Sequence, residues 1–242
     1  MKRLLRCYER EGLVTGEHCG DGNGEGKRRV LRVDGIPVSR DVIDALLVEL
    51  RAWKGDRRRG GSPNNRERPS IHAQSYMILR SPDVVSMQQQ NSSRRATRTA
   101  KKLERNRNLW DLAQVAMQEV DPTFSEQCTE LAVTYGFSGS PHIDKQNSGP
   151  FYGLSLGDFP EGQGGIRVEC SARVVAEMNT RNRLGRVDGR YPHWVAPYDD
   201  DAERFSLIYY QTGGSFLEPG PAIFAMPKAV GRANADSIDH QV

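Results

Sequence analysis

The sequence predicts a mainly β protein of the α+β class, with helices in its N-terminal half and strands in the remainder. From about residue 128 onward, short runs rich in β-branched and aromatic residues alternate with turn-forming residues, which is typical of strands. Before that point, apolar residues recur at helical spacing in two segments. The 242 residues are enough for one domain with a substantial core, or for a core with extensions.

The N-terminal part predicts a hairpin followed by a helix. Residues 27–38 are interpreted as a β-hairpin that turns at Asp34-Gly35. Ser39 is a predicted helix N-cap, because a serine oxygen there can accept a bond from the first free backbone N–H groups. The helix ends near Trp53, and its apolar stripe consists of Val42, Ile43, Leu46, Leu47 and Leu50.

Two segments of low complexity predict connections between these elements. Residues 16–26 are rich in glycine but lack the Gly-Lys-Ser/Thr ending of a phosphate-binding loop, so we expect a flexible connection. Residues 55–69 are rich in glycine, proline and charge, which predicts a linker or mobile loop.

The next stretch predicts a strand, an irregular segment and a second helix. The strand covers residues 70–79, and the irregular segment covers 81–93. The helix runs from about residue 98 to 119. Its apolar face, which we expect to pack on the sheet, consists of Leu109, Leu112, Ala113 and Ala116.

The C-terminal part predicts a succession of short strands. They are expected at residues 128–137, 151–156, 165–170, 173–178, 191–195 and 204–210. The last is rich in aromatic and β-branched residues, and side chains alternate across a strand. One face therefore presents Arg204, Ser206, Ile208 and Tyr210, and the other presents Phe205, Leu207 and Tyr209.

Two histidines and one carboxylate form a candidate metal site. In the run His142-Ile143-Asp144, residues i and i+2 of an extended segment point the same way, so His142 and Asp144 can share one ion. His193 lies 49 residues after Asp144 and would come from a distant strand folded back beside them. This donor set suits non-haem Fe(II) and leaves three coordination positions open.

Other interpretations of these residues were weighed. By itself, a His-x-Asp run occurs often by chance on a loop, and the later His193 and Arg204 favour the iron site. A structural zinc site is disfavoured because Cys7, Cys19, Cys128 and Cys170 show no Cys-x-x-Cys spacing. Asp188 could compete as a metal carboxylate, but Asp144 has the better spacing, and we expect Asp188 in a turn.

Arg204 and Ser206 are candidate ligands for a carboxylate. The planar, permanently charged guanidinium can bind a carboxylate in bidentate fashion, and a neighbouring hydroxyl adds a third hydrogen bond. The alternative is a surface arginine paired with the acidic run at residues 199–201. The apolar residues on the opposite face of the strand favour a buried position.

The stretch from Val133 to Thr212 resembles the core of Fe(II)/2-oxoglutarate oxygenases, with His-x-Asp, then His, then Arg-x-Ser. It is most similar to the branch of the ten-eleven translocation and base-J-binding oxygenases, which oxidise the methyl group of thymine or 5-methylcytosine. Two motifs carry this resemblance: His142-Ile-Asp-Lys-Gln-Asn147 and Arg204-Phe-Ser-Leu-Ile-Tyr-Tyr-Gln211. The chain is also similar to algal 5-methylcytosine-modifying enzymes of the same superfamily, which use ascorbate in place of 2-oxoglutarate.

The resemblance implies a fold and a division of the chain. It implies a double-stranded β-helix (jelly-roll, cupin-like) core with flanking N-terminal helices. Residues 1–69 would be a basic extension with the hairpin, one helix and the linker. Residues 70–227 would form the dioxygenase domain with its supporting helix, and residues 228–242 a disordered tail.

The resemblance also implies roles for individual residues. His142, Asp144 and His193 would be catalytic Fe(II) ligands. Arg204 and Ser206 would bind 2-oxoglutarate as co-substrate, or ascorbate would take its place. In the substrate site, Asn147 would hydrogen-bond a pyrimidine edge, and Tyr210 would stack on a base flipped out of the duplex. Thr212 stands where the family places a histidine, which leaves the identity of the base open.

Composition favours an intracellular enzyme, nuclear if its substrate is DNA. No apolar run is long enough to cross a bilayer, and the first residues lack the apolar region of a signal peptide. Residues 1–110 hold 24 Lys and Arg against 13 Asp and Glu, whereas residues 111–242 hold 10 against 18. A basic half joined to an acidic half indicates DNA as a partner beside dioxygen, although a solvated, partly disordered surface would look the same.

Two further functions remain open from the sequence. The same core could hydroxylate a small molecule or a peptide side chain. The chain could also be an inactive nucleic-acid-binding protein, although a decayed barrel would usually have lost a metal ligand. The oligomeric state does not follow from the sequence.

Overall fold

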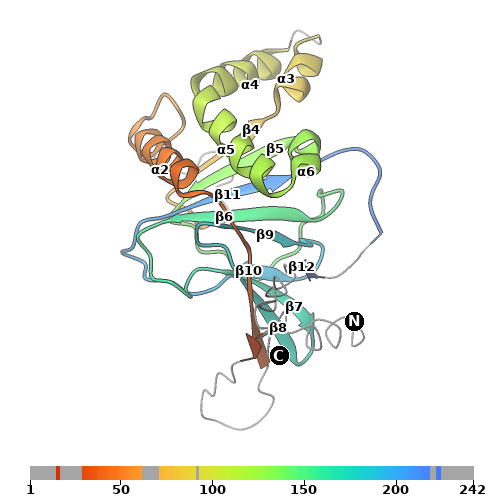
Figure 1. The fold of residues 1–242 in the computed structure, drawn as a ribbon. Coiled ribbons are helices and arrows are strands. Elements are labelled where there is room, and N and C mark those ends of the chain that lie inside the picture. The colour runs from red at the N-terminus through yellow and green to blue at the C-terminus, as the bar shows by residue number, and fades with distance from the viewer. Residues whose placement is uncertain (1–14, 17–28, 62–70, 91–92, 219–221, 225–242) are drawn as a thin grey trace, which may run out of the picture.

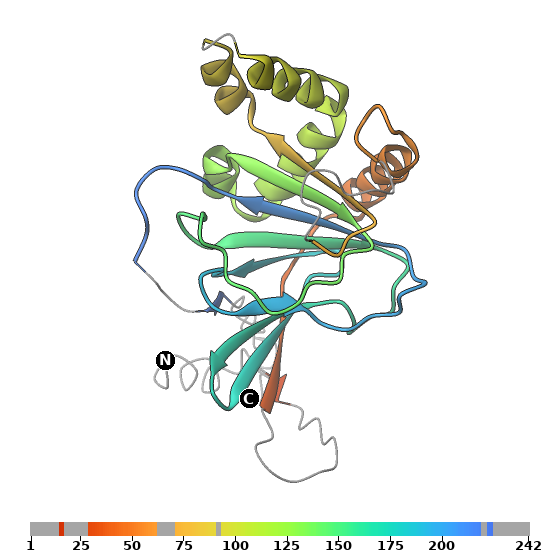
Figure 2. The same cartoon turned by 180° about the vertical axis from the view of Figure 1, so that it is seen from behind.

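The fold was analysed in a computed structural model that describes residues 15–16, 29–61, 71–90, 93–218 and 222–224. Two β-sheets face each other below a layer of helices (Figures 1 and 2). Among the described residues, no helix is both long enough and apolar enough to cross a membrane. The predicted tail at residues 228–242 lies outside the described part of the chain, as do residues 17–26 of the glycine-rich stretch.

The larger sheet is antiparallel and has the strand order β12-β9-β6-β11-β5-β4, with β3 paired to β9. Its strands are β3 (Ile36–Pro37), β4 (Ser75–Arg80), β5 (Glu130–Tyr135), β6 (Phe151–Gly157), β9 (Arg183–Val187), β11 (Arg204–Tyr210) and β12 (Ile223–Phe224). The smaller sheet has the order β1-β2-β8-β7-β10. Its strands are β1 (Thr15–Gly16), β2 (Arg29–Asp34), β7 (Ile166–Ser171), β8 (Val174–Asn179) and β10 (His193–Val195). Two facing sheets of mainly antiparallel strands confirm the predicted double-stranded β-helix class.

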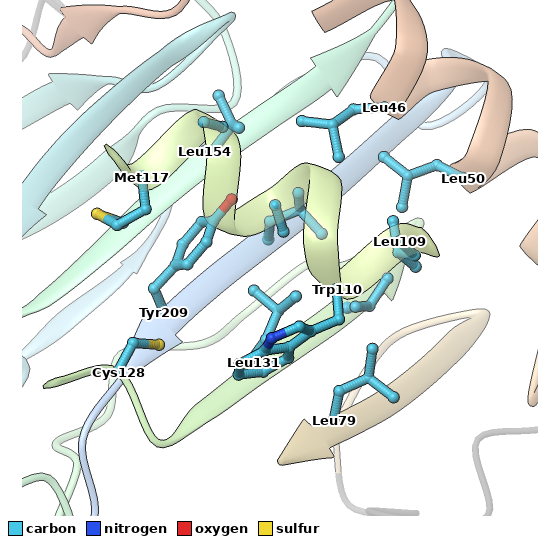
Figure 3. Close-up of a cluster of buried hydrophobic side chains, with 14 of the residues drawn as sticks. Leu46, Leu50, Leu79, Leu109, Trp110, Met117, Cys128, Leu131, Leu154 and Tyr209 are labelled. Atoms are coloured by element: carbon cyan, nitrogen blue, oxygen red, sulfur yellow. The ribbon is translucent and has the colours of Figure 1, made fainter. Parts of the chain in front are cut away.

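In the described part of the chain, helices lie on the outer side of the larger sheet (Figure 1). They are α2 (Arg40–Gly55), α3 (Pro82–Gln89), α4 (Arg94–Arg105), α5 (Arg107–Val120) and α6 (Pro122–Gln127). Figure 3 shows how α2 and α5 pack on the strands through Leu46, Leu50, Leu109 and Met117, which are all completely buried. The sheet contributes side chains such as Leu131, Leu154 and Tyr209 to the same core. Burial of apolar area of this kind is the main term that stabilises the fold.

The helix predicted after Ser39 is confirmed, but Ser39 does not cap it through its side chain. The Ser39 hydroxyl instead donates to Glu119 Oε1 at 2.6 Å, and its backbone N–H donates to Glu119 Oε2 at 2.9 Å. The start of α2 is therefore tied to the end of α5, in keeping with the close packing of these two helices.

The predicted hairpin at residues 27–38 is wrong. Strand β2 pairs in parallel with β8, and β3 pairs with β9, so the two strands do not pair with each other. Gly35 is required for close approach: a Cβ at this position would lie 2.8 Å from the carbonyl oxygen of Leu184 and 3.0 Å from that of Asn179. The segment expected to be an extension thus contributes strands to both sheets.

Two further predictions between residues 81 and 119 are corrected. The segment expected to be irregular contains α3, which begins after Ser81 because its side chain accepts from the backbone N–H of Val84 and a proline follows at the first turn. The single helix expected at 98–119 is two helices, α4 and α5, separated at Asn106. The completely buried Asn106 side chain donates to the carbonyl oxygens of Arg59 and Lys102, which ends α4.

The six strands predicted in the C-terminal part are present within a few residues of their expected bounds. Strands β1, β9 and β12 and helix α6 were not predicted from the sequence. Strand β9 contains a glycine and two arginines among five residues, so it lacks the apolar alternation that signals a strand.

Candidate metal centre and co-substrate pocket

The structure brings His142, Asp144 and His193 together. His142 and Asp144 lie in the connection from β5 to β6, and His193 is the first residue of β10. The backbones of the two histidines exchange hydrogen bonds of 3.0 and 2.9 Å, and the Asp144 N–H donates to the carbonyl oxygen of Gly189 at 2.8 Å. The loop that carries His-x-Asp is thereby held against the edge of the smaller sheet.

The three side chains have the geometry of one metal site. Their candidate ligand atoms all lie within 4.8 Å of one another. Each histidine Nε2 lies 3.8 Å from an oxygen of Asp144. His142 Nδ1 lies 2.8 Å from the carbonyl oxygen of Ser140, and His193 Nδ1 lies 3.0 Å from that of Tyr191. These contacts place the proton on Nδ1 and leave each Nε2 lone pair directed to a metal.

Burial keeps His193 in the form that binds a metal. Its side chain is largely enclosed, and desolvation lowers its pKa, although the charge of Asp144 acts in the opposite direction. We therefore expect the His193 imidazole to be neutral at neutral pH, with a free lone pair on Nε2.

Asn147 and Gly189 fix the position of the carboxylate. The amide Nδ2 of Asn147 donates to Asp144 Oδ2 at 2.9 Å, and Asn147 is itself buried. At Gly189, a Cβ would lie 2.8 Å from the same oxygen. Gly189 was not recognised from the sequence, because no local pattern shows that its loop passes so close to the Asp144 carboxylate.

Arg204 is a buried cation without an acidic partner. It is 1% exposed, and none of the described acidic residues forms an ion pair with it. Its Nη1 donates to Ser206 Oγ at 2.7 Å, and its Nη2 donates to Ser155 Oγ at 2.9 Å and to the carbonyl oxygen of Gly164 at 2.6 Å. Burial lowers the pKa of the guanidinium to about 10, so it stays charged at neutral pH.

The guanidinium still has hydrogen-bonding capacity to offer. Its Nε is buried without an acceptor. The rings of Tyr198 and Phe159 lie 4.9 and 5.5 Å from its central carbon, which partly compensates the charge. A buried positive charge with an unused donor is suited to an anionic ligand.

A single cavity of about 780 Å³ contains the metal triad, Arg204 and Ser206. The pocket face of the larger sheet forms its floor, and the alternation predicted for β11 holds: Arg204, Ser206, Ile208 and Tyr210 line the cavity, whereas Phe205, Leu207 and Tyr209 belong to the core under the helices. Across the sheet, Ser206 is paired with Ser155 on one side and Thr134 on the other. The Thr134 hydroxyl is buried and has no hydrogen-bond partner, so this group is also open to a ligand.

Two residues that anchor Arg204 were not recognised as functional from the sequence. The carbonyl oxygen of Gly164 accepts from Arg204, and a Cβ at Gly164 would lie 2.7 Å from Arg204 Nε. Ser155 lies in a correctly predicted strand, and its alternation could have placed it on the pocket face. Its pairing with Ser206 could not be foreseen.

Asp188 does not join the metal site. It is completely buried and forms an ion pair with Arg190, with 2.7 Å between Arg190 Nη2 and Asp188 Oδ2. Its backbone N–H donates to the carbonyl oxygen of Ala222. The choice of Asp144 over Asp188 as the candidate ligand therefore agrees with the geometry.

No protein-family model matches the chain, and no curated protein matches it. Among solved structures, a prolyl-4-hydroxylase of Pseudomonas putida is 13% identical, with a TM-score of 0.43, over 73% of this chain and 90% of its own. The dioxygenase for auxin oxidation 1 from Arabidopsis thaliana, in complex with 2-oxoglutarate, is 14% identical with a TM-score of 0.42 over 75% and 83%. NgTET1 in complex with 5mC DNA is 12% identical with a TM-score of 0.34 over 74% and 93%. This likeness is distant, and the chemistry below rests on the side chains of the pocket.

Proposed function

We propose that this chain is an Fe(II)- and 2-oxoglutarate-dependent dioxygenase. The observation that carries the proposal is that a two-histidine, one-carboxylate triad and a buried, acid-free arginine line the same cavity. His142, Asp144 and His193 would hold the iron, and three protein ligands would leave coordination positions free for the co-substrate and dioxygen. The donor set contains no thiolate, so it fits iron better than a structural zinc ion.

The protein residues bind and orient the co-substrate. Arg204, already held by Ser155, Ser206 and Gly164, would bind the distal carboxylate of 2-oxoglutarate through a charge-assisted hydrogen bond. Iron with 2-oxoglutarate supplies oxidation of a C–H bond by dioxygen, with formation of succinate and CO₂. Ascorbate carries no carboxylate that Arg204 could bind, and the buried cation therefore favours 2-oxoglutarate.

The cavity walls limit the access of water. Phe151 and Ile166 line the cavity and are 3% and 5% exposed, and the Phe151 ring lies 5.4 Å from that of His193. An apolar wall beside the metal excludes bulk water and strengthens electrostatic contacts inside the site. Asn147 holds the carboxylate ligand in orientation from the other side.

Substitution of Asp144 by alanine tests the metal site. The variant should lose the weak visible absorption band that forms when Fe(II) and 2-oxoglutarate are added without oxygen. It should also lose succinate formation. Its melting temperature without metal should change little, because the backbone bonds of His142 and His193 hold the loop. The exposed Asp200→Ala is the matched control and should behave as the unaltered protein. Undiminished succinate formation in Asp144→Ala would contradict the assignment.

We further propose that the substrate is a methylated pyrimidine in DNA. Tyr210 lines the cavity and offers an aromatic face to a flipped base. Asn147 uses one N–H for Asp144, so its carbonyl oxygen and second N–H remain for a base edge. The basic character of the N-terminal half suits a polyanion.

Mass spectrometry of methylated duplex DNA after incubation tests this substrate. Oxidised 5-methylcytosine or thymine should appear, and Tyr210→Ala should reduce the yield about 5- to 150-fold, since base stacking on an aromatic ring is worth roughly 1–3 kcal/mol. Succinate formation in the absence of DNA should fall much less. Succinate without any modified base would reject the DNA substrate and leave hydroxylation of a small molecule or peptide side chain on the same site.

A further inference from the structure

Helix α4 presents a straight stripe of positive charge. Its members are Arg94, Arg98, Lys101 and Arg105. Their spacing of i, i+4, i+7 and i+11 keeps them within about 60° of one another around the helix axis. All four are exposed, whereas Ala96 and Leu103 on the opposite face are buried. The stripe therefore faces solvent along the whole helix, which lies in the outer layer of the molecule (Figure 1).

The charges of this α4 stripe are not neutralised by the described part of the protein. No described carboxylate forms an ion pair with any of its four members. Arg98 Nε donates only to the carbonyl oxygen of Arg94, at 3.3 Å. Four like charges spaced by one helical turn repel each other, so the arrangement opposes helix stability unless an anion is present.

The stripe continues into the loop that follows α2. Arg105 Nη1 donates to the carbonyl oxygen of Arg58 at 3.2 Å, which places this loop beside the end of α4. Arg57 and Arg58 are both exposed. The Arg58 N–H donates to Asp56 Oδ1 at 2.7 Å and fixes the turn. This loop therefore brings two more exposed cationic residues close to the C-terminal end of the stripe.

We propose that the α4 stripe is a docking surface for the phosphodiester backbone of nucleic acid. Eleven residues of helix span about 16 Å, and one strand of a duplex carries a phosphate every 3.4 Å or so along its axis. A line of four cations is therefore matched in length to a short run of phosphates. The stripe is narrow, which suits a linear polyanion better than a planar one.

An anionic membrane fits this surface less well. Interfacial helices insert an apolar face into the bilayer, but the apolar residues of α4 pack inward on the protein core. The large hydrophobic residues that are exposed in the described chain all lie outside α4. They are Val48, Met87, Val115, Ile143, Phe216 and Leu217.

The docking surface is separate from the cavity. Leu103 of α4 belongs to the core on the helix-covered face of the larger sheet, whereas the cavity lies on the other face. The inference deepens the proposed DNA substrate and rests on it for its biological setting, but binding at α4 requires neither iron nor 2-oxoglutarate. The two proposals can therefore fail independently.

Fluorescence anisotropy with the metal-free full chain tests the α4 stripe. The probe is a labelled 20-base-pair duplex, titrated at several salt concentrations from 50 to 200 mM. The variant Arg98→Gln/Lys101→Gln should reduce the slope of log K against log[salt] by about 2, because each lost phosphate contact removes about 0.9. Glutamine preserves helix propensity, and circular dichroism of the variant checks that the helix content is unchanged.

A second double variant controls for net charge. Arg40→Gln/Arg173→Gln removes the same charge from exposed positions on α2 and between β7 and β8, and it should leave the slope unchanged. Equal effects of both variants, or no duplex binding by the unaltered chain at 50 mM salt, would overturn the proposal. The proposal would also be overturned if Arg98→Gln/Lys101→Gln lost binding to phosphatidylserine vesicles while its binding to the duplex stayed intact. Succinate formation from 2-oxoglutarate without nucleic acid, measured in parallel, reports the proposed dioxygenase alone.

Discussion

At the scale of single residues, the position of Arg204 depends on neighbours that carry no charge. Arg204 is oriented by two serine hydroxyls and one backbone carbonyl rather than by a carboxylate. An acidic partner would neutralise it, and it would then attract a dicarboxylate only weakly. Neutral acceptors fix the geometry and keep the positive charge for the ligand.

Gly164→Ala should weaken 2-oxoglutarate binding. The added Cβ would lie 2.7 Å from Arg204 Nε, so the guanidinium must move. Loss of one charged hydrogen bond costs about 1.5–3 kcal/mol, which corresponds to roughly a ten- to hundredfold higher Kd. Calorimetric titration of the metal-loaded protein measures it, and metal affinity should remain the same.

Gly162→Ala is the matched control for this change. Both glycines have positive φ, +64° at Gly164 and +77° at Gly162, so alanine strains the backbone similarly at each. A Cβ at Gly162 meets nothing within 4 Å. If the two variants bind 2-oxoglutarate equally, the effect comes from the backbone, and Gly164 has no role in holding Arg204.

At the scale of elements, the two sheets are joined by the short passage between β2 and β3. Strand β2 of the smaller sheet ends at Asp34, and β3 of the larger sheet begins at Ile36. The chain therefore passes from one sheet to the other at Gly35. The Gly35 N–H donates to the carbonyl oxygen of Asn179 at 3.0 Å. The backbone of one sheet thus passes close to that of the other where a side chain would not fit.

Gly35→Ala should destabilise the protein by about 1–3 kcal/mol, the usual cost of overpacking against fixed backbone. The colliding atoms belong to the main chain of Leu184 and Asn179 and cannot rotate away. Urea unfolding gives the difference in free energy. Gly55→Ala, at the end of α2 with nothing within 4 Å, serves as the comparison and should be neutral or stabilising by up to about 1 kcal/mol. Equal stability of the two variants would contradict the role of Gly35.

At the scale of the whole molecule, two buried clusters flank the larger sheet. One lies under the helices and includes Cys128, and the other lies between the sheets and includes Cys170. Burial raises the pKa of the Cys128 thiol to about 12 and also raises the pKa of Cys170. The reactivity of each thiol therefore measures the opening of the cluster to which that cysteine belongs.

Alkylation of these thiols at pH 8 should be very slow in the folded protein. A thiol with a pKa of about 12 is deprotonated in only about one molecule in ten thousand at pH 8, and the thiolate is the reactive form. Because the folded pKa lies above the usual 9, the unfolded thiol ionises first, and the thiol's contribution to folding stability is lost as the pH rises above 9. Peptide mass spectrometry after iodoacetamide treatment in increasing urea measures both sites.

Both cysteines should become reactive at the same urea concentration, because the larger sheet contributes to both clusters. Modification of Cys170 at clearly lower urea than Cys128 would show that the smaller sheet opens independently. Rapid modification of Cys128 in native buffer would contradict its burial.

The features that depend on local periodicity and residue chemistry could be predicted from the sequence alone. The spacing of His142 and Asp144, the alternation along β11 and the apolar stripe of α2 all follow from strand and helix geometry, and the structure agrees with each. The mainly β class is confirmed for the same reason. The closeness of His193 to His142 and Asp144 was expected from residue type, and the fold brings the three side chains together across the intervening sequence.

Tertiary structure decided the features that depend on contacts between distant segments. Local rules interpreted Asp34-Gly35 as a hairpin turn, but the parallel partner of β2 lies some 145 residues away, and long-range pairing outweighed the local preference. The break at Asn106 is set by the carbonyl oxygen of Arg59. Gly164 and Gly189 have no side chain, and this leaves space for Arg204 and Asp144, respectively. The sequence alone cannot show which atoms will occupy that space.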